Sequence, residues 1–123
     1  MRVATPDLEV FVGLYGKKIS NEQNLFLTEY IRYNSEIWSA DLVHVRNDHA
    51  VFVLNHNFRA WGHQFIYDYS TLSDAMKTAG FREIARQEPQ ISQDPHLSNL
   101  EYRKNLVGVF DALVVEGTKP SRR

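Results

Sequence analysis

Over residues 1–16 the pattern of apolar and polar residues changes from strand-like alternation to helical spacing. Apolar or β-branched residues occupy alternate positions of residues 1–5 (MRVAT), which is typical of a strand, and Pro6 ends the run. A helix start follows. Thr5 suits the N-cap, Pro6 suits the first helical position, and Asp7 suits the positive end of the helix dipole. Apolar residues follow at helical spacing as far as Gly16, so the sequence predicts a helix directly after the first strand.

The next segment carries one clear helix and one ambiguous stretch. Ser20 and Gln23 form a capping-box pattern, and the apolar positions behind them predict a second helix that runs to about Asn34. Farther on, residues 37–45 suit a short helix. Residues 50–54 (AVFVL) suit a strand by residue type but equally continue a helix, so both alternatives remain open.

The remaining third of the chain predicts one helix and two strands. Asp68 or Ser70 caps a short helix, and Gly80 suits the left-handed residue that ends it. Residues 81–88 (FREIARQE) alternate weakly and indicate a half-exposed strand. Residues 107–116 (VGVFDALVVE) give the clearest strand pattern on the chain and predict the last strand.

The order of these elements predicts a single α/β domain over residues 1–123. Residues 1–5 supply the first strand, residues 6–60 a helical insertion, and residues 61–118 a helix–strand–strand unit. A helix between the first and second strands suits a parallel crossover, whereas the last two strands are near in sequence and suit an antiparallel pair. We therefore expect a small mixed sheet of three strands.

Composition narrows the class of protein. The chain has 123 residues, of which 43% are hydrophobic and 24% charged, as in ordinary globular domains. Fourteen basic and fifteen acidic residues give a net charge of −1, which argues against a nucleic-acid binder. The chain has no cysteine, so disulfides, thiolate metal sites and a cysteine nucleophile are excluded. The sequence shows no signal-peptide pattern and no apolar run of membrane length, so we expect a cytoplasmic protein without membrane contact.

Five histidines raise the question of a metal site. A helical pair of metal ligands needs a spacing of three or four positions, so that both lie on one face. Successive histidines here stand five or more positions apart, and no His-Glu-x-x-His pattern occurs. We therefore expect no metal site and interpret the histidines as ordinary polar or interface residues. They are His44, His49, His56, His63 and His96.

The chain resembles a known enzyme family along nearly its whole length. Four stretches carry the likeness: MRVATPDLE, WGHQFIYDYSTLSDAMKTAGF, REIARQEP and ALVVEGTKP. In this order they are similar to four parts of class I S-adenosylmethionine-dependent methyltransferases: the fifth strand with the helix start behind it, the helix before the sixth strand, the sixth strand and the seventh strand. The resemblance implies the C-terminal half of that Rossmann-like fold, with the last strand antiparallel between the other two.

The likeness does not include the cofactor half. In that family a glycine-rich turn after the first strand and an acidic residue after the second hold the cofactor. The six glycines here are scattered, at positions 13, 16, 62, 80, 108 and 117, and none forms such a turn. The family's first four strands have no counterpart. The resemblance thus implies a substrate-side half that binds S-adenosylmethionine weakly or not at all and is inactive alone, so whether this chain is an enzyme stays open.

The Trp-Gly-His segment corresponds to the region near the family's substrate mouth. By that resemblance His63 acts as a general base on an acceptor hydroxyl, with Tyr67 one helical turn away. Trp61 and Phe65 would then contact the acceptor. The alternative is structural, in which His63 and Tyr67 fix a loop by hydrogen bonds while Trp61 packs. We interpret Asp7 as a helix-start residue rather than a catalyst.

Two functions remain open. The first is a methyltransferase-like protein for a small or sugar-like acceptor, whose cofactor half is carried by a companion chain. The second is a non-catalytic module for oligomerisation or partner binding, which the missing glycine-rich turn favours for this chain alone. In either case residues 1–5 leave one strand edge open. We therefore expect a homo-oligomer such as a dimer, or a complex with the companion chain.

Overall fold

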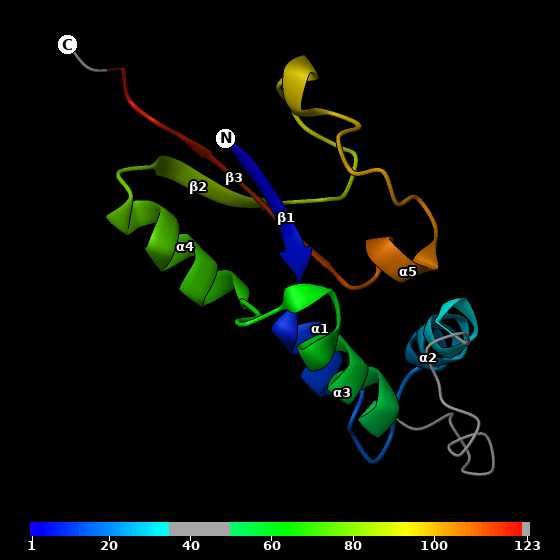
Figure 1. Ribbon diagram of the computed structural model, residues 1–123. Coiled ribbons are helices and arrows are strands. Elements are labelled where there is room, and N and C mark those ends of the chain that lie inside the picture. Colours follow the sequence, from blue (N-terminus) through cyan, green and yellow to red (C-terminus); the bar gives the residue numbers. More distant parts are fainter. Residues whose placement is uncertain (35–49, 122–123) are drawn as a thin grey trace.

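The computed structural model describes residues 1–34 and 50–121 (Figure 1). Its strands are β1 (Arg2–Pro6), β2 (Arg82–Gln87) and β3 (Ala112–Thr118). Its helices are α1 (Leu8–Gly13), α2 (Asn21–Tyr33), α3 (Ala50–Arg59), α4 (Tyr69–Thr78) and α5 (Leu106–Val109), with short 3₁₀ turns η3 (Ala60–Gly62) and η4 (Pro95–Leu97). The short helix expected over residues 37–45 lies outside the described residues. Residues 50–54 belong to α3, so the helical alternative for this stretch is correct.

The strand order is β1-β3-β2, so the last strand lies between the other two as expected. β3 pairs antiparallel with both neighbours, and Arg2 faces Glu116 in β3 while Gln87 faces Val114. The expectation of a mixed sheet is wrong in one respect. β1 and β2 run parallel, but β3 separates them, so both pairings in the described sheet are antiparallel.

Asp7, rather than Thr5, caps α1. The Asp7 N–H donates to the Asp111 carbonyl oxygen at 2.9 Å, which extends the β1–β3 ladder and keeps Thr5 within it. The buried Asp7 carboxylate accepts a hydrogen bond from the Glu9 N–H at 3.1 Å and pairs with Arg86. The interpretation of Asp7 as a helix-start residue is therefore confirmed. Through its backbone N–H and its carboxylate, Asp7 also connects α1 to the sheet.

The other local signals behave as the sequence predicts. Ser20 and Gln23 form the reciprocal capping box at the start of α2. Asp68 rather than Ser70 caps α4, because its carboxylate accepts the Thr71 N–H at 2.7 Å. Gly80 follows α4 with φ +87°, the left-handed conformation expected of it.

The last strand starts later than the sequence predicts. Residues 107–116 were expected to form one strand, but β3 begins only at Ala112. Gly108 has φ +108°, which breaks the extended run, and residues around it form the short helix α5. The Asp111 carboxylate accepts the Gly108 N–H at 2.6 Å and holds this turn closed.

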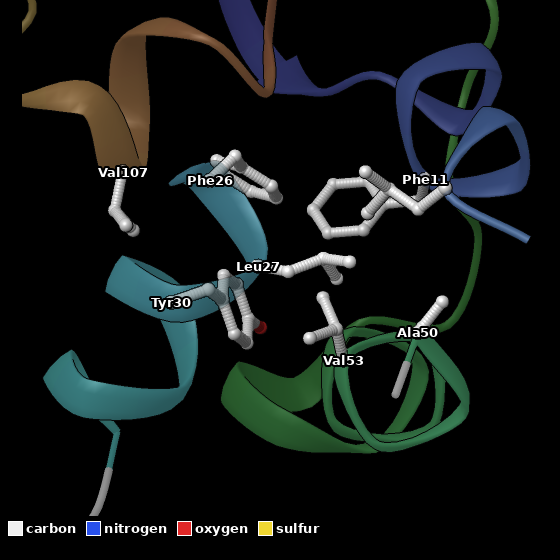
Figure 2. Packing of buried hydrophobic residues seen from close by; sticks show 8 residues of the cluster. Phe11, Phe26, Leu27, Tyr30, Ala50, Val53 and Val107 are labelled. Atoms are coloured by element: carbon white, nitrogen blue, oxygen red, sulfur yellow. The ribbon is translucent and has the colours of Figure 1, made fainter. Parts of the chain in front are cut away.

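Two hydrophobic clusters hold the elements together. One joins α1, α2, α3 and α5, and Figure 2 shows its aromatic and aliphatic side chains facing one another: Phe11, Phe26, Leu27, Tyr30, Ala50, Val53 and Val107. The other lies between α4 and one face of the sheet, where Leu72 and Met76 pack against Leu113 and Val115. In Figure 1, α4 runs beside β2 while the other helices gather beyond the carboxyl end of β1.

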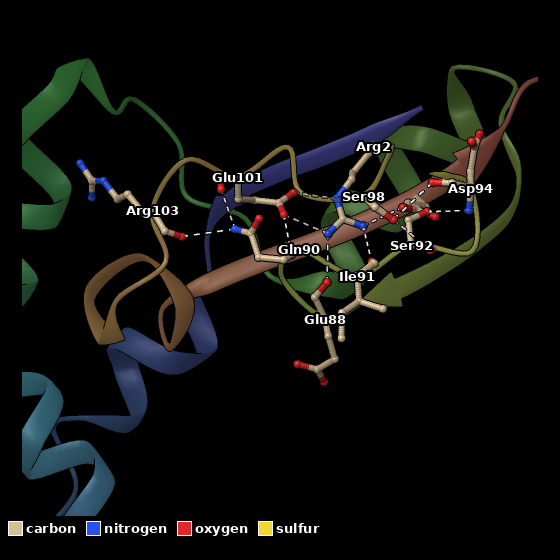
Figure 3. A network of polar contacts seen from close by, with 10 residues as sticks. Arg2, Glu88, Gln90, Ile91, Ser92, Asp94, Ser98, Glu101 and Arg103 are labelled. Carbon is tan, nitrogen blue, oxygen red and sulfur yellow. Dashed lines mark hydrogen bonds and ion pairs between the residues drawn. The ribbon is translucent and has the colours of Figure 1, made fainter. Parts of the chain in front are cut away.

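The opposite face of the sheet is covered by a loop that a single arginine holds in place. Arg2 has five N–H groups, and each donates a hydrogen bond (Figure 3). Glu101 takes two of them side by side, at 2.6 and 3.1 Å, and Glu116 takes one at 2.6 Å. The carbonyl oxygens of Glu88 and Ile91 take the other two, at 2.9 and 2.8 Å. The Arg2 side chain is only 2% exposed.

We expect the charge-conserving substitution Arg2→Lys to lower the free energy of unfolding by at least about 2 kcal/mol, because a lysine has three donors and no planar fork. The control is the reverse swap, Lys77→Arg, at the exposed pair of Lys77 with Asp74 on α4, which should change stability by less than about 0.5 kcal/mol. Urea unfolding of the three proteins measures both effects. Equal effects of the two swaps would show that the Arg2 network is not a major source of stability.

Candidate functional site

Trp61 and His63 lie in a tight reversal after α3. Trp61 has φ 55° and Gly62 has φ 73°, and the Trp61 ring meets the His56 ring edge to face at 4.6 Å between centroids. The His63 Nδ1 lies 2.7 Å from the Asn57 carbonyl oxygen. Because a carbonyl only accepts, Nδ1 is the donor in this hydrogen bond. This hydrogen bond is of the loop-fixing kind, and it does not involve Nε2.

Phe65 and Tyr67 form a separate pair. Their rings meet at 4.8 Å between centroids, and Phe65 is 63% exposed. Tyr67 packs against the cluster between α4 and the sheet, and its carbonyl oxygen accepts the Leu8 N–H at 2.9 Å. The structure thus gathers the four candidate residues as two pairs rather than one site. The acceptor and base roles of Trp61, His63, Phe65 and Tyr67 stay predictions.

A buried tyrosine–histidine pair lies behind Trp61. The Tyr30 hydroxyl lies 2.8 Å from His56 Nδ1, and both side chains are buried in the helical cluster. Burial raises the pKa of the Tyr30 hydroxyl and lowers the pKa of His56. The pair is therefore held in its uncharged form. No group of three or more potential metal ligands occurs among residues 1–34 and 50–121.

A cavity of about 380 Å³ opens at the carboxyl end of β1, beside the loop that Arg2 holds. β1, the loop over residues 100–103, and the segment that leads into β3 all contribute to its wall. The lining residues are Arg2, Ala4, Thr5, Pro6, Leu100, Glu101, Tyr102, Arg103, Gly108, Asp111 and Ala112. None of the four residues singled out in the sequence lines this cavity.

Asp111 is the buried acid of the cavity. It is 8% exposed, and burial raises the pKa of its carboxyl group. One carboxylate oxygen, Oδ1, accepts the Gly108 N–H. A side chain at position 108 would place its Cβ 2.5 Å from the Arg103 Cβ, so this turn requires glycine. Asp111, Gly108 and Arg103 therefore depend on one another for their positions.

Arg103 connects the cavity to the reversal that contains Trp61. Its guanidinium carbon lies 5.8 Å from the Tyr33 ring centre, 5.9 Å from that of Trp61 and 5.6 Å from that of Tyr102. Its Nε donates to the Tyr102 hydroxyl at 3.0 Å. Sequence reasoning missed Arg103 and Asp111, because a single charged residue in a loop or before a strand has no local signature.

The described residues do not fit S-adenosylmethionine. Its cradle needs a glycine-rich turn between a strand and a helix, where the backbone approaches the ligand closely. Between β1 and α1 the chain has only Asp7, with its carboxylate committed to the helix cap and to Arg86. Gly62, Gly80 and Gly108 have positive φ, but each lies after or within a helical turn.

Comparisons of the chain with models of known protein families, with curated proteins and with solved structures find no match. In the part of the chain that the structure describes, the helices are too short or too polar to cross a lipid bilayer. The site is therefore defined by its geometry: a cavity beside one strand end, a buried carboxylate in it, and an arginine held by aromatic rings.

Stability should depend on pH through His56. The folded pKa lies below 6.5, so as the pH falls below about 6.5 the unfolded chain binds a proton that the folded chain does not. The free energy of unfolding then falls by up to about 1.4 kcal/mol per pH unit until the folded pKa is reached. His56→Gln, which keeps an acceptor for Tyr30, should remove this slope.

The matched control is His96→Gln, because His96 is exposed. Chemical unfolding at several pH values between 7 and 5 compares the three proteins. The prediction fails if the slope of the His56 variant equals that of the wild type.

Proposed function

We propose that this chain is the substrate-side half of a methyltransferase-like fold and that the cavity beside β1 takes the acceptor. The strand order β1-β3-β2 is the main support. β3 runs antiparallel between two strands that are parallel to each other, α1 follows β1, and α4 precedes β2. This is the arrangement that the resemblance implies for the C-terminal half of the family. The order is informative because it differs from the order along the chain.

The position of the cavity supports the same proposal. In open α/β sheets, ligands bind beyond the carboxyl ends of the parallel strands. Thr5 and Pro6 end β1, and Asp111 lies at the same end because β3 runs in the opposite direction. A carboxylate at this place suits an acceptor that carries a proton on oxygen or nitrogen. His63 remains the alternative base that the sequence suggests.

On this proposal the cofactor half lies outside the described residues, and the outer edge of β1 is where it would join the sheet. Met1 and Gly117 exchange two backbone hydrogen bonds, and the Asp7 N–H donates to the Asp111 carbonyl oxygen. From Met1 to Asp7, the backbone groups of every second residue therefore point towards β3. Arg2 and Ala4 therefore direct their backbone groups to the outer side of β1. No described residue pairs with that edge. An open edge supports association with a companion chain or a second copy.

The alternative proposal is a non-catalytic module for oligomerisation or partner binding. The open edge of β1 supports it equally well, and so do large side chains that are more than half exposed. Tyr33, Phe65 and Tyr102 are 59%, 63% and 82% exposed. Binding of an acceptor in the cavity would favour the first proposal, and association without any ligand would favour the second.

We expect no saturable heat of binding when S-adenosylmethionine is titrated into the isolated chain to about 1 mM in a calorimeter. The reason is that the described residues form no cradle for the cofactor. A dissociation constant in the micromolar range would contradict the proposal that another chain carries the cofactor half.

We also expect the chain to associate through β1. Size exclusion with light scattering should give a mass above 14.3 kDa at micromolar concentration. Ala4→Pro should shift the mass towards the monomer, because it removes an outward N–H without removing a β1–β3 hydrogen bond. A wild-type chain that runs as a well-folded monomer, or an Ala4→Pro variant that associates as strongly as the wild type, would contradict association through this edge.

A further inference from the structure

The walls of the β1 cavity are apolar except at a few points. Ala4, Pro6 and Ala112 come from the sheet, and Leu100 comes from the loop that crosses it. A volume of about 380 Å³ is in the range of small-molecule sites. The volume and the lining therefore suit a small ligand that has an apolar body and a polar group.

Asp111 is a buried acid in the wall of the cavity. Its Oδ1 accepts the Gly108 N–H, and no other described residue donates to its carboxylate. The side chain is more than nine-tenths buried, yet it lines the cavity. The second carboxylate oxygen, Oδ2, is not sealed off from solvent, so a ligand in the cavity can reach it with a hydrogen-bond donor.

The charges around the cavity favour a cation over an anion. All five N–H groups of Arg2 already donate hydrogen bonds, to Glu101, Glu116 and two carbonyl oxygens. Arg103 is held by three aromatic rings, and in Figure 3 its guanidinium points away from the Arg2 network. Among the described residues, three carboxylates thus lie near two guanidinium groups: Arg2 is shared by Glu101 and Glu116, and Asp111 has only the charge of Arg103 nearby, without an ion pair.

From these observations we propose that the β1 cavity binds a small molecule with a protonated amine on an apolar body, and that Asp111 holds the amine. This inference rests on the proposed function, because it names the class of acceptor that the substrate-side half would take. The cation is an ammonium group rather than a metal ion, since the described residues offer no group of three metal ligands. A raised pKa of Asp111, caused by burial, is consistent with a carboxylate that gains from a cationic partner.

Three probes of nearly equal size test the proposal: benzylamine, benzyl alcohol and benzoate. Each is titrated to about 10 mM into the full ¹⁵N-labelled chain near neutral pH, a range that covers fragment affinities. The Gly108 amide is the reporter, because it donates directly to Asp111. We expect benzylamine to shift this amide with saturation, at least about tenfold more tightly than benzyl alcohol, and benzoate to leave it unchanged.

Asp111→Asn is the matching variant. An asparagine Oδ1 still accepts the Gly108 N–H, while the free position becomes an NH₂ donor and the buried charge is removed. Binding of benzylamine should fall at least about tenfold. Asp74→Asn, on the exposed surface of α4, is the control and should bind as the wild type does. Ala112→Leu fills the cavity without changing its charge and should abolish binding.

The proposal is wrong if benzoate binds as well as benzylamine, if no probe binds, or if both Asp111→Asn and Ala112→Leu bind benzylamine normally. The amide spectrum itself shows whether each variant is folded, and Ala112→Leu stands in for Asp111→Asn if that variant unfolds. These outcomes are distinct from a failure of the proposed function. Tight binding of S-adenosylmethionine to the isolated chain would overturn the two-chain proposal and leave the amine result unaffected.

Discussion

The burial of one guanidinium group determines how the second face of the sheet is covered. A buried arginine is tolerated only when its donors are satisfied and its charge is balanced. Arg2 meets both conditions through one loop, because Glu101 and two carbonyl oxygens come from residues 88–101 and only Glu116 comes from the sheet. Gln90 strengthens the same loop by donating its N–H to Glu101 at 2.7 Å. The hydrogen bonds from Arg2 lower the pKa of Glu101, which keeps this carboxylate charged well into the acidic range. The part of the cavity wall that this loop supplies is therefore fixed by polar contacts.

The helical cluster reaches the cavity through a continuous series of ring contacts. Phe26 meets Tyr30, Tyr30 meets His56, and His56 meets Trp61, with ring centres 5.6, 5.6 and 4.6 Å apart. Trp61 then lies beside the Arg103 guanidinium. Aromatic pairs of this kind stabilise beyond the area that they bury. The position of Arg103 in the cavity wall thus depends on packing among residues that do not line the cavity.

Sequence reasoning succeeded where structure is decided locally. The capping box at Ser20 and the left-handed Gly80 depend on residues close by in sequence, whereas the order of the strands was implied by the family resemblance and not by local pattern. It failed where distant residues decide. Thr5 has the chemistry of a cap, but the bond from Asp7 to Asp111 keeps it in the sheet. Asp111 sits in a run of apolar residues, and nothing near it in sequence shows that β1 and the loop over residues 100–103 form a cavity around it. The candidate residues from Trp61 to Tyr67 drew attention because aromatic and histidine side chains are conspicuous, whereas the cavity is built from ordinary ones.

The sheet joins the two ends of the chain, and this has a consequence for how the protein reaches its structure. Arg2 and Glu116 are separated by 114 residues, yet they face each other in neighbouring strands. β1 and β2 cannot pair with each other, since β3 must come between them. β1 therefore cannot join this sheet until β3 (Ala112–Thr118) is available, whereas most of the helical cluster comes from α1, α2 and α3, which are much closer together in sequence. Closing so long a loop is entropically costly and slows folding. In the meantime an unpaired strand and a bare Arg2 are exposed to solvent and to other chains.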